Sequence, residues 1–184
     1  MPFAAVLDAS VLYPLPLRDT LLRIAETELY DVYWSEHILH EVVRNLIADG
    51  RATAEQARRL TDTMTAAFEG AAVPQGAVDR IEPGMTNEPK DRHVLAAAVA
   101  AGANAVVTLN LKDFPAGACR PLGIDALHPD TLLLDLHALD PDIVRDAVER
   151  QAAALRRPPL SLPELLDRLA VTVPQFAATL REAQ

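Results

Sequence analysis

The stretch that decides the fold runs from Asn87 to Phe114 and reads NEPKDRHVLAAAVAAGANAVVTLNLKDF. Its first half predicts a helix, because the residues from Val94 to Ala101 are almost all small or apolar. Gly102 can end this helix in a left-handed cap. Ala105–Leu109 then forms a short buried strand. The stretch is therefore a helix–strand unit whose helix can pack closely against a flat surface.

Carboxylates mark the ends of this unit and of the first predicted strand. Asp91 lies near the start of the helix, and Asp113 lies in the turn Asn110–Asp113, just past the strand. Asp8 follows Phe3–Leu7, an apolar run typical of a central parallel strand. Ligands of open parallel sheets bind at the carboxyl ends of the strands. We therefore expect Asp8 and Asp113 to face a common site.

The rest of the chain alternates between short apolar runs and amphipathic segments. This alternation predicts an α/β fold with three layers, α/β/α, around a central parallel sheet. A capping box supports the start of one helix. The further strands expected are Val32–Trp34 and Ile124–Leu127, and the further helices are Asp19–Leu29, Glu36–Ala48, the segment from Thr53 to Glu69, and the short Thr131–Leu136.

The composition shifts near Asp140, where an aspartate and a proline predict a new helix start. Three short helices are expected beyond it, with an interhelix break at Arg156–Pro159. We therefore predict one α/β domain over residues 1–140 and a helical C-terminal extension over residues 141–184.

Composition limits the classes of function. The chain has 184 residues and a net charge of -9, which argues against non-specific coating of nucleic acid. Its single cysteine, Cys119, cannot form an internal disulfide, so we expect a reducing, cytoplasmic location. We expect no membrane association, because no apolar run reaches spanning length and the N-terminal run is interrupted by Asp8.

The chemistry expected of the site follows from its carboxylates. Asp8, Glu41, Asp91 and Asp113 would repel one another strongly unless protons or hard cations compensate them. Oxygen ligands suit Mg²⁺ or Mn²⁺, and no cysteine and histidine set for Zn²⁺ is present. Taken singly, each acid has an ordinary reading as a helix cap or a solvated charge. Their order and flanking residues together favour a shared acidic site.

The chain resembles the PIN-domain ribonucleases of the VapC toxin type. The segments VLDAS, SEHILHEVVRNL, KDRHVLAAAVAAGA and VVTLNLKDF are similar to the four motif blocks of that family, in order. The resemblance covers residues 1 to about 125 and places the family's acidic quartet on the four residues named above. Ser10 matches the small hydroxyl position after the first acid, and Asn110 matches the polar residue before the last. The tail from residue 141 is similar to the helical extension of a larger PIN subgroup.

This resemblance implies a function and partners. It implies Mg²⁺- or Mn²⁺-dependent cleavage of RNA, of the tRNA or rRNA class, leaving 5′-phosphate and 3′-hydroxyl ends. It also implies a homodimer and a cognate antitoxin protein, as in a type II toxin-antitoxin module. Asp8, Asp91 and Asp113 would be metal ligands, and Glu41 would be a ligand or would orient the attacking water. Arg92 and Lys112 are our candidates for RNA contacts, because each adjoins a site acid.

Two other functions remain open from the residues alone. One is a Mg²⁺-dependent phosphatase on a similar sheet, since an aspartyl nucleophile also follows a first strand. That class often carries a second aspartate two residues later, where this chain has Ser10. The other is a non-catalytic module whose acidic edge binds a cationic partner, which the net charge of -9 allows.

Overall fold

A five-stranded parallel sheet forms the centre of the protein. The structure is a computed structural model and describes residues 3–155 and 159–182. The strand order is β3-β2-β1-β4-β5, and neighbouring strands are parallel throughout. The strands are β1 (Ala4–Leu7), β2 (Asp31–Ser35), β3 (Ala72–Val73), β4 (Ala105–Val107) and β5 (Asp125–Leu127).

The central strands β1 and β4 bring the two ends of the predicted site together. All residues of both strands are buried, which explains why these runs contain no polar side chain. Leu7 pairs with Val107, so the two strands end in register. The backbone N–H of Asp8 then donates to the carbonyl of Val107 at 3.0 Å. The residues after β1 and after β4 therefore lie side by side at one edge of the sheet.

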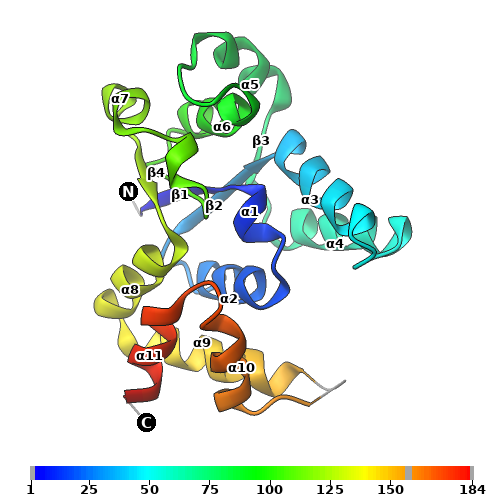
Figure 1. Cartoon of the computed structure of the whole chain (residues 1–184), viewed down its shortest axis with the longest axis vertical. Helices are drawn as coiled ribbons and strands as arrows, with labels where there is room; N and C mark the ends of the chain where they lie inside the picture. The colour runs from blue at the N-terminus through cyan, green and yellow to red at the C-terminus, as the bar shows by residue number, and fades with distance from the viewer. Residues whose placement is uncertain (1–2, 156–158, 183–184) are drawn as a thin grey trace.

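Helices cover both faces of the sheet and confirm the predicted three-layer α/β/α architecture (Figure 1). The helix of the quoted stretch, α6 (Arg92–Ala101), packs against β1, β2 and β4, and its residues Val94–Ala98 are fully buried. Its small side chains allow this close approach. The other helices are α1 (Ala9–Leu12), α2 (Leu15–Ala25), α3 (Glu36–Ala48), α4 (Ala54–Ala67), α5 (Gln75–Ile81), α7 (Ala116–Cys119), α8 (Pro129–Leu139), α9 (Pro141–Ala154), α10 (Leu162–Leu169) and α11 (Pro174–Glu182), and the 3₁₀ turns that matter here are η1 (Glu82–Gly84), η2 (Pro89–Asp91) and η3 (Leu111–Asp113).

Local caps define the ends of three helices. The side chain of Ser35 accepts the backbone N–H of Ile38 at 3.2 Å and begins α3. Thr53 and Gln56 form the reciprocal capping box of α4. Gly102 ends α6 with φ 64°, a left-handed conformation that glycine adopts at little cost.

Two predicted boundaries were wrong. The second helix begins at Leu15 instead of Asp19 and ends at Ala25, because a proline in the first turn is compatible with a helix start. The fourth strand ends at Val107 instead of Leu109. Beyond it, the backbone N–H of Thr108 still donates to the carbonyl of Leu127 at 3.0 Å, and the side chain of Thr108 bonds a carboxylate, as described below.

The C-terminal helices pack onto the same hydrophobic core as the sheet. On α9, Gln151 is 1% exposed; its Oε1 accepts from Thr20 Oγ1 at 2.6 Å and its Nε2 donates to the carbonyl of Pro16 at 3.0 Å. On α8, the buried carboxylate of Asp130 accepts two backbone N–H groups at the start of α11. These polar contacts hold the extension against α2 and α8.

Other expectations for this region have different outcomes. Three short helices follow Asp140, as predicted. Most of the expected break at Arg156–Pro159 lies outside the described residues, and the division at residue 140 stays a prediction. In the described ranges, no helix is both long enough and apolar enough to cross a membrane.

Candidate active site

An acidic cleft opens at the carboxyl edge of the sheet, where β1 and β4 end. Its volume is about 480 Å³, and three of the four predicted carboxylates line it. Asp8 follows β1, Glu41 lies on α3, and Asp91 ends η2 just before α6. The sheet topology therefore brings together residues that are widely separated in the sequence. The other residues that line the acidic cleft are Ser10, His37, Arg44, Asn45, Glu82, Pro89, Lys90, His93 and Asn110.

Asp8 is held rigidly by hydroxyl groups. Its Oδ2 accepts hydrogen bonds from Ser10 Oγ and from Thr108 Oγ1, both at 2.7 Å. Ser10 Oγ in turn accepts the backbone N–H of Leu109 at 3.0 Å, and Thr108 Oγ1 accepts that of Asn110 at 2.9 Å. The network joins the tips of β1 and β4 and occupies one carboxylate oxygen. It therefore fixes the orientation of a side chain that is only 4% exposed.

Asp91 and Asp113 form the second part of the site. Both are 7% exposed, and the Oδ2 atom of each is buried without a hydrogen-bond partner in the described structure. Lys90 Nζ lies 3.8 Å from Asp91 Oδ2 and 3.5 Å from Asp113 Oδ2. Burial and the nearby carboxylates, Asp8 first among them, together raise the pKa of Asp91 to about 6 against the opposing effect of Lys90. The ionised form of Asp91 is therefore only partly compensated by Lys90.

Glu41 is in a similar situation. Burial raises its pKa above the ordinary value, and the charge of Asp8 adds to this effect, while Arg44 opposes it. Arg44 Nη2 lies 3.9 Å from Glu41 Oε1. His93 Nε2 lies 3.7 Å from Glu41 Oε2, but burial lowers the pKa of His93 to about 4, so the imidazole is neutral at pH 7. The glutamate is thus only partly compensated.

Two histidines stack beside Glu41. The rings of His37 and His93 lie 3.8 Å apart between centroids and 13° from parallel. His93 is 1% exposed, and its Nδ1 has no hydrogen-bond partner in the described structure. His37 is exposed and covers it at the wall of the acidic cleft. His93 therefore supports the wall of the acidic cleft as a neutral ring.

The residues present fit a hard divalent cation. The donor set consists of carboxylate oxygens, and the unpartnered Oδ2 atoms of Asp91 and Asp113 offer ligand positions. Among the residues that the structure describes, however, no three acidic, histidine or cysteine side chains stand close enough to enclose an ion as they are. Lys90 occupies the space between two of the carboxylates. Convergence around a cation would therefore require the ammonium group to move.

The structure also places the remaining predicted residues. Asn110 and Ser10 line the acidic cleft. Asp113 is not among its lining residues, but it contacts Lys90, which is. Arg92 donates its Nε to the carbonyl of Asn87 at 3.3 Å, and Lys112 is exposed on η3. Neither of these two residues lines the cleft.

Sequence reasoning missed three members of the site. Thr108 was taken as part of the strand, although it is the first hydroxyl after the buried run and bonds Asp8. Glu82 adds a fourth acid to the cleft wall from η1, a segment for which the sequence pattern was mixed. The place of Lys90 between two site acids follows only from the fold, because the residues it contacts come from two separate turns.

Comparison with known proteins identifies two family models along the chain. Residues 4–112 match the model of the PIN domain, and residues 129–182 match that of the VapC50 C-terminal domain. A curated protein of Mycobacterium tuberculosis (strain ATCC 25618 / H37Rv), named "Putative ribonuclease VapC50", is 47% identical over 97 residues. The match covers 53% of this chain and 57% of that relative, so it spans little more than half of either. No solved structure matches the chain.

Proposed function

Since this chain belongs to the PIN domain family, we propose that it is a metal-dependent endoribonuclease of the VapC type. The observation that carries the proposal is the acidic cleft, in which Asp8, Glu41 and Asp91 meet at the carboxyl edge of a parallel sheet. The name of the relative from Mycobacterium tuberculosis, which describes a ribonuclease, points to the same activity.

The cofactor proposed is Mg²⁺ or Mn²⁺, held by Asp8, Asp91 and Asp113, with Glu41 as a further ligand or as the group that orients water. When bound, such an ion supplies an activated water and neutralises charge on the phosphodiester. The oxygen of Asp8 that bonds Ser10 and Thr108 is already occupied, so its other oxygen, Oδ1, is the one to offer. Burial raises the pKa of Glu41, which makes this carboxylate a better proton acceptor for a water that it orients.

The reaction proposed is a hydrolysis. A water oxygen forms a bond to phosphorus, and the bond from phosphorus to O3′ breaks. One proton of the water passes to O3′, so the products carry a 5′-phosphate and a 3′-hydroxyl. The role of the chain is to orient the water at Glu41 and to hold the phosphate close to Asp8 and Asp91. Lys90, released from Asp113, is well placed to contact a phosphate oxygen.

The biological setting proposed is a type II toxin-antitoxin module. The match of residues 129–182 to the VapC50 C-terminal domain supports a VapC-type protein with a helical extension. On this proposal the chain acts on tRNA or rRNA, forms a homodimer, and pairs with an antitoxin protein that blocks the acidic cleft. Sedimentation velocity of the purified chain tests the dimer, and co-purification with the product of an adjacent gene tests the antitoxin.

The enzymatic proposal is tested by thermal unfolding and by RNA cleavage. Mn²⁺ and Mg²⁺ should raise the unfolding midpoint of the wild type with increasing concentration, because they bind the native state. The rise should vanish in Asp91→Asn and persist in Asp62→Asn, an exposed acid on α4. Cleavage of total tRNA and rRNA should follow the same pattern, with 5′-phosphate ends found by sequencing.

Other outcomes would support the alternatives. Full cleavage by Asp91→Asn would overturn the assignment of the site. Turnover of p-nitrophenyl phosphate without RNA cleavage would favour the phosphatase, and no response to either ion would favour the binding module.

A further inference from the structure

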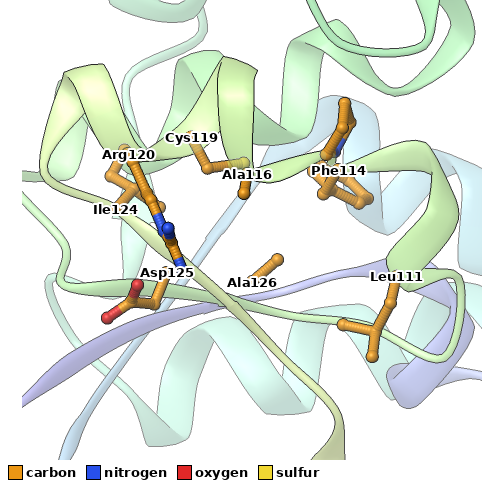
Figure 2. Close-up of a pocket in the computed structure, with 9 residues that line it drawn as sticks. Leu111, Phe114, Ala116, Cys119, Arg120, Ile124, Asp125 and Ala126 are labelled. Carbon is orange, nitrogen blue, oxygen red and sulfur yellow. The ribbon is translucent and has the colours of Figure 1, made fainter.

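Another pocket is lined in part by Asp125 and Ala126 of the edge strand β5 (Figure 2). It has a volume of about 260 Å³. Figure 2 shows Leu111 and Phe114 at one end and the charged side chains of Arg120 and Asp125 at the other. We name it the edge pocket. Its remaining lining residues are Pro115, Ala116, Cys119, Ile124 and Ala126.

The edge pocket and the acidic cleft share one turn of the chain. Asn110 lines the acidic cleft, and its neighbour Leu111 lines the edge pocket. Asp113 on the same turn, η3, pairs with Lys90, while Phe114 again faces the edge pocket. Adjacent Cα atoms are about 3.8 Å apart. The edge pocket and the acidic cleft are therefore neighbours along this turn of the chain.

The lining of the edge pocket suits a flat ring with polar edges. Leu111, Phe114 and Ile124 supply apolar contacts for the faces of such a ring. The guanidinium of Arg120 and the carboxylate of Asp125 lie at one end of the pocket. No ion pair within 4.0 Å is found between Arg120 and Asp125 in the described structure, and both are exposed. Their hydrogen-bonding groups thus remain available. At about 260 Å³ the pocket is just under the roughly 300–1,000 Å³ of sites for drug-sized molecules, so it suits a single ring system.

The geometry points to the edge pocket as a binding site for an unpaired guanine base of the RNA substrate, next to the bond that is cut. Arg120 would donate to O6 and N7 of the base, a pairing that arginine makes with guanine. Asp125 would accept from N1–H and the 2-amino group, which are neighbouring donors on the Watson–Crick edge. Such a base must be unstacked to enter, as in single-stranded loops. This inference rests on the proposed function and names the substrate feature that the site recognises.

Binding of short RNAs to the metal-free protein tests the inference separately from cleavage. The probes are the pentamers UUGUU, UUIUU (with inosine) and UUUUU, and free guanosine 5′-monophosphate, in buffer with a chelator. The readout is the shift of backbone amide resonances on titration. UUGUU should bind at least about fivefold more tightly than UUUUU, the lower bound of the discrimination by one bidentate pair. The shifts should include Leu111, Ile124 and Asp125.

Variants identify the groups that read the base. Inosine lacks the 2-amino group, so the wild type should bind UUIUU more weakly than UUGUU. Asp125→Ala should bind the two pentamers equally, because the acceptor for that amino group is gone. Asp62→Ala, a matched change at an exposed position of α4, should keep the wild-type preference. The unfolding midpoints of both variants should equal that of the wild type. Arg120→Met should lower the affinity for UUGUU to that for UUUUU.

Each contrary result has a distinct meaning. Equal affinity for UUGUU and UUUUU would overturn the inference, even if the protein cleaves RNA with Mn²⁺. Tighter binding of guanosine 5′-monophosphate than of UUGUU would overturn it in favour of a free-nucleotide site. A guanine preference in a protein that cleaves no RNA with either ion would leave the base pocket standing and would overturn the proposed function.

Discussion

Lys90 lies between Asp113 and Asp91. The Nζ atom of Lys90 is 3.5 Å from Asp113 Oδ2 and 3.8 Å from Asp91 Oδ2. Both carboxylate oxygens are buried and accept no hydrogen bond in the described structure. The ammonium group therefore takes the role of a cation between two site acids. The charges of Asp91 and Asp113 raise the pKa of Lys90 above its ordinary value, which favours the charged ammonium form.

Lys90→Met removes this internal cation. We expect the metal-free variant to unfold at a lower temperature than the wild type, because Asp91 and Asp113 then repel each other without compensation. We expect its affinity for Mn²⁺ to rise by about threefold to tenfold, since each exposed ion pair is worth up to about 1 kcal/mol. Isothermal titration calorimetry measures the affinity. Lys112→Met, on the neighbouring turn, is the control and should change neither quantity. Weaker Mn²⁺ binding in Lys90→Met would show that the lysine assists the ion instead of competing with it.

Asp91→Asn should stabilise the metal-free protein in a pH-dependent way. The folded pKa of Asp91 is about 6 and the unfolded value is 3.8, so ionisation between these values lowers the stability of the wild type. The variant should therefore be more stable at pH 8, by on the order of 2–3 kcal/mol. This advantage should shrink as the pH falls through 6 and should be gone near 4. Urea unfolding at several pH values measures it. A difference that is constant from pH 4 to pH 8 would contradict the assigned pKa.

His93→Phe should change the acid response in the opposite direction. Burial lowers the folded pKa of His93 from 6.5 to about 4, so the unfolded chain binds the proton more readily in this window. Stability from His93 is therefore present above pH 6.5 and is lost as the pH falls toward 4. Phenylalanine keeps the stack on His37 without titrating, so the stability of the variant should fall less steeply between pH 6.5 and 4. His40→Phe, an exposed position on α3, should leave the slope unchanged.

Thr108→Val tests the support of Asp8. Thr108 Oγ1 donates to Asp8 Oδ2 at 2.7 Å and accepts the backbone N–H of Asn110 at 2.9 Å. Valine has the same shape but leaves both groups without this partner, so we expect a loss of about 1–3 kcal/mol in the free energy of unfolding. We also expect weaker Mn²⁺ binding, because Asp8 is no longer held in place. Thr63→Val, on the exposed face of α4, is the comparison. Unchanged ion affinity would mean that Ser10 alone orients Asp8.

Asp130→Ala tests the attachment of the C-terminal helix. The carboxylate of Asp130 accepts the backbone N–H of Gln175 at 3.0 Å and that of Phe176 at 2.8 Å. Without it, two N–H groups in the first turn of α11 lose their acceptor, so we expect a loss of about 1–3 kcal/mol. Hydrogen exchange should speed up in residues 174–182. Asp135→Ala, at an exposed position of α8, should not have this effect. Equal exchange in both variants would show that apolar packing alone holds the helix.

Much of the fold could be predicted because its signals are local. A cap such as Ser35 or the box of Thr53 and Gln56 works through groups three residues apart, so the sequence displays the whole interaction. Apolar runs such as Ala105–Val107 predict buried strands, because the signal again lies within a few consecutive residues. The α/β class, the left-handed cap at Gly102 and the placement of Asp8 beyond a strand all followed from such signals.

The tertiary structure alone decided which side chains meet. Thr108 reaches Asp8 because β1 and β4 are neighbours in register, and Lys90 reaches Asp113 because η2 and η3 lie beside each other. Gln151 binds Thr20 across 131 positions of the chain for a similar reason. Contacts of this kind depend on strand order, register and packing, which sum many weak interactions over the whole chain, so no short stretch of sequence displays them. The sequence determined which acids were available for a site. The packing of the sheet determined that three of them line one cleft, whereas the carboxylate of Asp113 lies outside that lining and contacts Lys90, which belongs to it.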